Sequence, residues 1–133
     1  MDPQRPLSPR GLEHASRLAA DAASRGVKPA VVWHSGKLRA RQTAEAMWRA
    51  CNPLAEFVAA RGLQPGDTPD EIVGRVAGET RDIMLVGHMP NLPRVLEALT
   101  RGRNADARAE FPTHGLVALD AVGDAWVEKW RMD

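Results

Sequence analysis

The sequence predicts an α/β domain, which we place over residues 1–133. Two short apolar runs, residues 30–33 and 83–87, are bounded by turn residues in the way typical of buried strands. Amphipathic helical patterns precede and follow each run, and an alternating segment near the carboxyl terminus predicts a hairpin. The resulting order of helix, strand, helix, helix, strand, helix and hairpin belongs to the α/β class.

The first helix is predicted to begin after Ser8, because serine is a good N-cap and Pro9 suits the first turn. Apolar residues then recur at helical spacing, at Leu12, Ala15, Leu18, Ala19, Ala22 and Ala23. Gly26 is the expected stop. The first strand follows at 30–33, and Ser35 and Gly36 end it.

A second helix follows this turn, and its apolar face is made of Ala40, Thr43, Ala44, Met47, Trp48 and Cys51. Asn52 and Pro53 end it. Residues 54–66 predict an irregular connection that holds a short strand or a turn of helix. Thr68 is then predicted to cap a third helix, with Pro69 and Glu71 in the first turn, and this helix runs to about Gly78.

The second buried strand, 83–87, is followed at once by His88. A fourth helix is marked by Leu92, Val95, Leu96 and Leu99 and is expected to stop near Gly102. Residues 115–122 and 125–132 then form the two strands of the hairpin, with a turn between them. Trp126 and Trp130 lie four residues apart in the second of these strands, which predicts that they share a face.

Composition excludes several classes of function. The 18 Lys and Arg against 17 Asp and Glu give a net charge of +1, so we expect no nucleic-acid partner. No apolar run approaches the roughly 18 residues of a membrane span, and the amino terminus is not a signal peptide. We therefore expect no membrane partner and a cytoplasmic location. Cys51 is the only cysteine, so an internal disulfide is impossible.

The ends of the two predicted strands carry the candidate functional residues. Arg39 lies in the first turn of a helix, where backbone N–H groups and a guanidinium both favour an anion such as phosphate. His88 follows the second strand, and ligands of open α/β sheets bind beyond the carboxyl ends of strands. If the strands are parallel, Arg39 and His88 face one crevice. His34 and His114 are further candidates for lining it, whereas His14 is expected at the surface.

Two other chemistries lack support in the sequence. No two of the four histidines have helical i, i+4 spacing and no Cys-x-x-Cys motif is present, so no metal site is predicted. There is also no Gly-x-Ser-x-Gly motif of a nucleophilic serine.

The motifs Ser35-x-x-x-Arg39-Ala40-x-Gln42-Thr43-Ala44 and Val86-Gly87-His88-x-Pro90 resemble the histidine phosphatase superfamily. Within it the chain is most similar to the SixA-type phosphohistidine phosphatases. Further matching segments are Arg5-Pro6-Leu7-Ser8-x-x-Gly11, Gly62-Leu63-x-Pro65 and Phe111-Pro112-Thr113. The resemblance implies a three-layer, phosphoglycerate-mutase-like fold.

The resemblance also implies a site. In the family, two histidines and two arginines hold phosphate, and one histidine attacks phosphorus to form a covalent phosphohistidine. Arg39 matches the second arginine, His88 the second histidine, and Ser35 a position that shapes the site. The implied substrate is a phosphohistidine-bearing protein or a small phosphoester, and no metal or organic cofactor is implied. Other branches use a glutamate acid, for which Glu56 is a weak match.

One departure from the family is large. The first arginine and the nucleophilic histidine belong to an Arg-His-Gly motif after an amino-terminal strand, and no Arg-His pair occurs in this sequence. We therefore expect a fold truncated at that strand, a true start further upstream and no activity without the nucleophile. A non-catalytic relative that binds phosphate or phosphohistidine is the alternative. A fragment unable to fold is a third hypothesis, since a missing strand exposes sheet edges.

Overall fold

The computed structural model describes residues 4–101 and 111–132, and its elements follow the predicted order. The elements are α1 (Pro9–Ser24), β1 (Val31–His34), α2 (Leu38–Cys51), β2 (Glu56–Ala59), α3 (Asp70–Ala77), β3 (Ile83–Val86), α4 (Asn91–Thr100), β4 (Leu116–Val122) and β5 (Ala125–Met132). Helix α1 begins as predicted, because the Ser8 side chain accepts a hydrogen bond from the backbone N–H of Gly11 at 3.0 Å.

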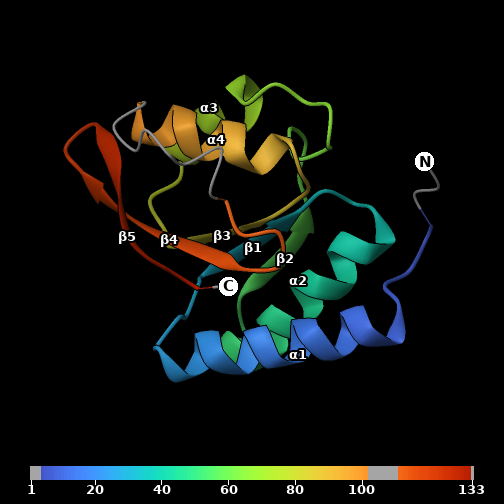
Figure 1. Ribbon diagram of the computed structural model, residues 1–133. Helices are drawn as coiled ribbons and strands as arrows, with labels where there is room; N and C mark the ends of the chain where they lie inside the picture. Colours follow the sequence, from blue (N-terminus) through green and yellow to red (C-terminus); the bar gives the residue numbers. More distant parts are fainter. Residues whose placement is uncertain (1–3, 102–110, 133) are drawn as a thin grey trace.

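Strands β2, β1 and β3 form a parallel sheet in that order, and β4 pairs with β5 in a separate antiparallel hairpin. Helices α1 and α2 cover one face of the parallel sheet, and α3 and α4 cover the other (Figure 1). The result is three layers of α/β structure, as the sequence predicts.

Each face of the sheet has its own apolar core. The α1–α2 core consists of Leu18, Ala19, Ala22, Val32, Ala44, Met47, Ala55 and Met84. The α3–α4 core consists of Val31, Trp33, Ala60, Leu63, Ile72, Val76 and Val95. Strand β1 supplies both, because successive side chains of a strand point to opposite faces.

Part of the connection at 54–66 is a strand. Strand β2 lies parallel to β1, with Glu56 opposite Val31 and Ala59 opposite His34. The strand has four residues, its two end residues are exposed, and its apolar residues at 57–59 do not alternate with polar ones, so the sequence left a strand and a turn of helix both open. Pairing with β1, which is a non-local contact, fixes this conformation.

Two helix ends and one helix face can be compared with the prediction in detail. Pro69, not Thr68, occupies the N-cap of α3, and no side chain caps this helix. Leu12 is 42% exposed, so the apolar face of α1 is narrower than the spacing predicts. Helix α4 ends at Thr100 with Arg101 as its C-cap, whose φ of 55° is left-handed; Gly102, near which the stop was expected, lies outside the described residues.

Strand β3 is less buried than predicted. All four residues of β1 are buried, whereas in β3 only Met84 is. Among the strands of the described residues, β3 pairs with β1 alone, so its second edge has no strand beside it. The sequence prediction of a fully buried strand is therefore wrong for β3.

The hairpin contains a β-bulge. Ala118 pairs with Trp130 and Leu119 with Glu128, so Lys129 is an extra residue in β5. The bulge reverses the alternation of side chains beyond it and places Trp126 and Trp130 on opposite faces. Trp126 packs against the α3–α4 core, whereas the Arg25 guanidinium lies 4.9 Å from the Trp130 ring. The prediction that the two tryptophans share a face is wrong.

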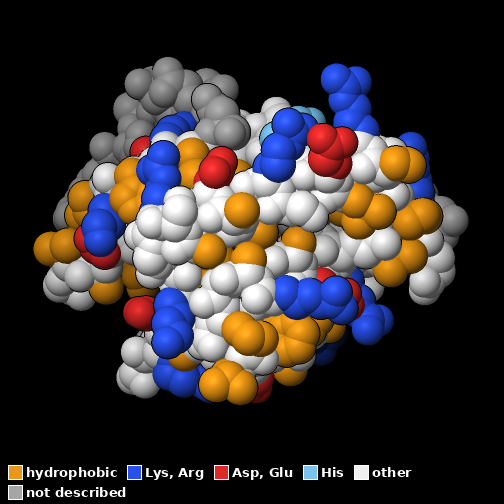
Figure 2. Space-filling view, turned by 90° about the horizontal axis from the view of Figure 1, so that it is seen from below, with side chains coloured by type: hydrophobic (Ala, Val, Ile, Leu, Met, Phe, Trp, Pro, Cys, Tyr) orange, Lys and Arg blue, Asp and Glu red, His pale blue; other side chains and the backbone are white. Residues whose placement is uncertain are grey.

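Two surface properties bear on partners. None of the helices in residues 4–101 and 111–132 is long and apolar enough to cross a membrane. Basic and acidic side chains are interspersed with apolar ones over the face in Figure 2, which agrees with a net charge of +1.

Candidate functional site

The carboxyl ends of β1 and β3 lie side by side, as the parallel pairing of His34 with Val86 requires. Ser35 follows β1, and His88 follows β3 after one glycine. The Ser35 Oγ atom and the His88 Nε2 atom are 2.6 Å apart. The structure thus brings together two of the predicted site residues, which lie 53 positions apart in the chain.

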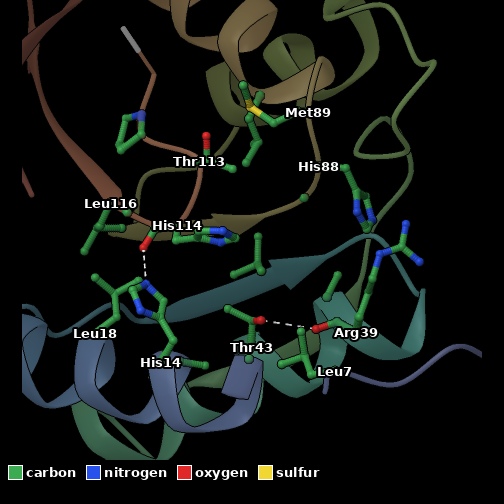
Figure 3. Close-up of a pocket in the computed structure, with 18 of the residues that line it drawn as sticks. Leu7, His14, Leu18, Arg39, Thr43, His88, Met89, Thr113, His114 and Leu116 are labelled. Carbon is green, nitrogen blue, oxygen red and sulfur yellow. Dashed lines mark hydrogen bonds between the residues drawn. The ribbon is translucent and has the colours of Figure 1, made fainter. Parts of the chain in front are cut away.

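Arg39 and His88 line one end of a cavity of about 640 Å³. Their side chains point toward one another in Figure 3, Arg39 from the first turn of α2 and His88 from the loop before α4. The buried Ser35 does not line the cavity and reaches the site through its contact with His88. The predicted crevice at the carboxyl ends of the strands is therefore present.

The hydrogen bonds around Ser35 indicate the tautomer of His88. The Ser35 hydroxyl oxygen accepts a bond from the Lys37 backbone N–H at 3.3 Å. Its own proton is then available to the Nε2 atom of His88. A neutral His88 that accepts at Nε2 carries its proton on Nδ1.

His88 is poised to be neutral while the site is empty. Burial, and after it the positive charges of Arg39 and Lys37, together lower the pKa of His88 to about 4. An anion beside the imidazole would oppose both effects, because a negative charge favours the protonated form.

The start of α2 adds to the attraction for anions. Its N-cap, Lys37, is positively charged and makes no side-chain capping bond, and the helix dipole favours a negative charge at this end of α2. Gln42 holds the amino-terminal segment against this helix by accepting a bond from the Leu7 N–H at 2.7 Å. A guanidinium, an imidazole and a helix start together suit an oxyanion.

His34 lies outside the cavity lining. Its Nδ1 atom accepts a bond from the Gly36 N–H at 3.1 Å, and its ring lies 4.9 Å from the Phe57 ring. Burial and then Arg41 lower the pKa of His34, while Glu45 acts in the opposite direction. Its hydrogen bond shapes the turn after β1.

The other two histidines lie at the opposite end of the cavity (Figure 3). His114 lines it, as predicted, and its backbone carbonyl lies 2.7 Å from the Nε2 atom of His14. His14, which was expected at the surface, is half-buried and also lines the cavity. A signal for this was present, because His14 stands one helical turn before the buried Leu18.

Glu56 lies at the wrong end of the sheet to act as an acid in this site. It pairs with Val31, at the beginning of β1, and its carboxylate bonds the Arg81 guanidinium at 3.0 Å. The weak match of Glu56 to a catalytic glutamate is therefore overturned. No group of three or more candidate metal ligands occurs within residues 4–101 and 111–132.

The cavity also separates the two sheets. Residues Met84, Leu85, Val86, Gly87 and His88 line it along β3, and Gly115 and Leu116 line it at the start of β4. In the described part of the chain, β3 is paired only with β1, and β4 only with β5. A strand edge of each sheet thus borders the same cavity.

Comparison with known proteins agrees with this architecture. Residues 2–65 match the family described as the histidine phosphatase superfamily (branch 1). The structure of the putative phosphohistidine phosphatase SixA from Agrobacterium tumefaciens is 28% identical, with a TM-score of 0.85, and the match covers 100% of this chain and 86% of that one. No curated protein matches the sequence.

Two further structures share the fold. The protein histidine phosphatase SixA complexed with tungstate is 20% identical, with a TM-score of 0.87 over 99% of this chain and 86% of that one. Phosphoglycerate mutase from Plasmodium falciparum is 16% identical, with a TM-score of 0.67 over 92% and 83%. The chain therefore has the phosphoglycerate-mutase-like fold, and its residues 2–65 match the model of the histidine phosphatase superfamily.

Proposed function

We propose that residues 1–133 form a single phosphohistidine-phosphatase-like domain that holds a phosphoryl group between Arg39 and His88. The observation that carries the proposal is the meeting of these two side chains at one end of the cavity, with Ser35 bonded to His88 at 2.6 Å. The SixA structure that contains tungstate supports it, because tungstate, like phosphate, is a tetrahedral oxyanion.

Each proposed residue has a distinct role. The Arg39 guanidinium can donate two parallel hydrogen bonds to phosphoryl oxygens and offset their charge. Once it is protonated beside the anion, His88 carries a positive charge and an N–H donor on each ring nitrogen. Ser35 holds the His88 imidazole in place. The substrate we propose is a phosphohistidine-bearing protein or a small phosphoester, and the proposal needs no metal or organic cofactor.

Turnover requires one further group. In the covalent route of the family, a histidine nitrogen bonds to phosphorus as the substrate's bond to phosphorus breaks, and water then releases phosphate. The sequence has no Arg-His pair to supply that histidine. His14 and His114 line the opposite end of the cavity from Arg39 (Figure 3), and His34 lies outside its lining.

We therefore propose that residues 1–133 bind phosphate without hydrolysing phosphohistidine. The position of the cavity, between the edges of β3 and β4, supports the interpretation that a strand ending in Arg-His-Gly would complete the catalytic site there. The alternative function, a non-catalytic module for phosphate or phosphohistidine, shares the binding step and differs only in needing no such strand.

The binding step is tested by comparing two neighbouring arginines. Arg41 is the matched control, because its side chain is 58% exposed and its Nε atom lies 3.3 Å from Glu45. We expect Arg39→Ala to weaken phosphate or tungstate binding by about tenfold or more, the effect of losing a charged hydrogen bond. Arg41→Ala should change it by less than about twofold. Isothermal titration measures both, and equal losses would refute the assignment of Arg39.

Hydrolysis separates the two candidate functions. Residues 1–133 should release no phosphate from phosphohistidine beyond the uncatalysed rate. The same domain preceded by an apolar strand and Arg-His-Gly should hydrolyse it with turnover if the phosphatase function is correct. A folded, phosphate-binding but inactive extended protein would favour the binding module, and turnover by residues 1–133 would overturn the proposed role of the missing histidine.

A further inference from the structure

The loop of residues 62–67, between β2 and α3, touches both of the loops that carry the proposed phosphate site. The Gln64 side-chain amide donates to the backbone carbonyl of Ser35 at 2.5 Å. On the other side, the Asn91 amide donates to the carbonyls of Gly62 and Asp67, each at 3.1 Å. Asn91 is the first residue of α4, directly after the His88 loop, and it is 0% exposed.

The 62–67 loop is itself closed by hydrogen bonds. The Gln64 N–H donates to the Asp67 carboxylate at 2.9 Å, and the Asp67 N–H donates to the Gln64 carbonyl at 3.0 Å. Leu63, which lies between Gly62 and Gln64 in the chain, is 0% exposed and belongs to the α3–α4 core. Gly62 has a φ of +95°, and a Cβ there would lie 3.0 Å from the Ile72 nitrogen. A loop tied in this way moves as one unit.

The same loop packs directly on the backbone before His88. A Cβ atom on Gly87 would lie 3.0 Å from the carbonyl oxygen of Leu63, so only glycine permits this approach without a shift. Two side-chain amides and one backbone contact therefore connect the Ser35 turn, the 62–67 loop and the His88 loop. The Ser35–His88 distance of 2.6 Å lies at the end of this chain of contacts.

We propose that the 62–67 loop sets the spacing between Ser35 and His88, with Gln64 and Asn91 as positioning residues. Neither side chain lines the cavity, so both act through the loops that they hold. Each supplies N–H donors to backbone carbonyls, and an amide suits this because it stays neutral while it donates. The effect on phosphate binding rests on the proposed function, whereas the effect on the titration of His88 does not.

A purely structural anchor would have a different signature. Loss of such an anchor lowers the melting temperature and leaves the environment of His88 unchanged. Loss of a positioning residue lets the Ser35 turn move away from His88 and admits water. Burial is the main reason that the pKa of His88 is low, so a wetter site should titrate at higher pH.

The test uses Gln64→Met, which keeps the length of the side chain and removes its donor. Arg61→Ala is the matched control in the neighbouring position, because Arg61 is 89% exposed and lies 3.8 Å from Glu71. We expect Gln64→Met to raise the pKa of His88, measured by NMR titration of its imidazole, and to weaken phosphate binding by about tenfold. Arg61→Ala should leave both unchanged.

Asn91→Ala provides a second variant. It should also raise the pKa of His88, and it should lower the melting temperature, because it leaves one buried and one half-buried carbonyl without their donor. If the Asn91→Ala protein fails to fold, the measurements on Gln64→Met alone test the inference. A Gln64→Met protein whose His88 titration matches that of the unmodified protein would overturn the inference.

The two proposals fail in different ways. An unmodified protein that binds no phosphate would contradict the proposed function, yet the His88 titration would still test the role of Gln64. A protein that binds phosphate equally well with Gln64 or Met, and whose His88 titration is unchanged, would contradict the positioning role alone.

Discussion

Strands β1 and β3 are both four-residue apolar strands of one parallel sheet, yet their surroundings differ. β1 has a strand on each side, and all four of its residues are buried. β3 has β1 on one side and the cavity on the other, and three of its residues are half-buried. Two similar apolar runs thus differ in exposure. The number of neighbouring strands decides how much water is excluded from a strand, and the run itself does not encode that number.

The same contrast holds for function. The turn after β1 is built from tight local contacts, in which His34 and Ser35 side chains bond the backbone of Gly36 and Lys37. The loop after β3 sends His88 to the cavity. The turn after β1 supplies the tightly bonded side of the site, and the loop after β3 supplies His88, the side chain that we propose contacts the phosphate.

The largest expected effect tests the burial contrast directly. Val32→Ala in β1 should lower the free energy of unfolding by about 2–3 kcal/mol, because Val32 is 0% exposed and a cavity would remain. Val86→Ala in β3 should cost about 1 kcal/mol, since water already reaches that side chain. Denaturant unfolding followed by circular dichroism measures both.

Equal costs at the two positions would contradict the contrast between the strands. The unmodified chain provides the control, and its unfolding must be cooperative for the comparison to be valid. A broad transition without cooperativity would instead support the hypothesis that residues 1–133 are a fragment unable to fold.

A second prediction compares the two histidines near these strand ends. Phosphate should raise the pKa of His88 from about 4 by roughly 1–3 pH units, because a nearby anion favours the imidazolium. His34 lies outside the cavity lining, so its titration should not move. NMR titration of both imidazoles, with and without phosphate, measures the difference; a shift at His34 and not at His88 would place the anion elsewhere.

The low pKa of His88 also has a consequence for stability. Its folded value of about 4 is below the ordinary 6.5, so between these two pH values the unfolded chain binds more protons. The contribution of His88 to stability is therefore fully present above pH 6.5 and is lost as the pH falls toward 4. His88→Asn should make the unfolding free energy less dependent on pH in this window, as measured by denaturant unfolding at several pH values.

The smallest expected effect concerns the glycine that follows β1. Gly36 has a φ of +93°, and a Cβ there would have room, with Ala59 at 3.9 Å. Gly36→Ala should therefore cost about 1 kcal/mol of stability, from backbone strain alone. Gly26, also at positive φ with nothing within 4 Å, is the matched control, and its alanine variant should cost a similar amount. Only Gly36→Ala should also weaken phosphate binding, as titration can show.

Local signals in the sequence were sufficient for most elements and for the pair at the centre of the site. The cap at Ser8, the helical spacing of α2 and the motifs around Arg39 and His88 are all read from residues close together in the chain. The strand at Glu56–Ala59 and the open edge of β3 depend on distant partners. Gln64 occupies the unspecified position x of the motif Gly62-Leu63-x-Pro65. The motif therefore identifies the loop but says nothing about the role of Gln64.

The extra residue Lys129 has a consequence for how this hairpin can vary. It reverses the alternation of side chains along β5. Trp126 therefore packs on the side of α3 and α4, whereas Trp130 lies beside Arg25, which follows α1. Deletion of Lys129 would restore the regular period of two and force one tryptophan to leave its layer. A one-residue gap at this place therefore changes which face of the hairpin a tryptophan occupies, whereas the same gap in a loop would only shorten a connection.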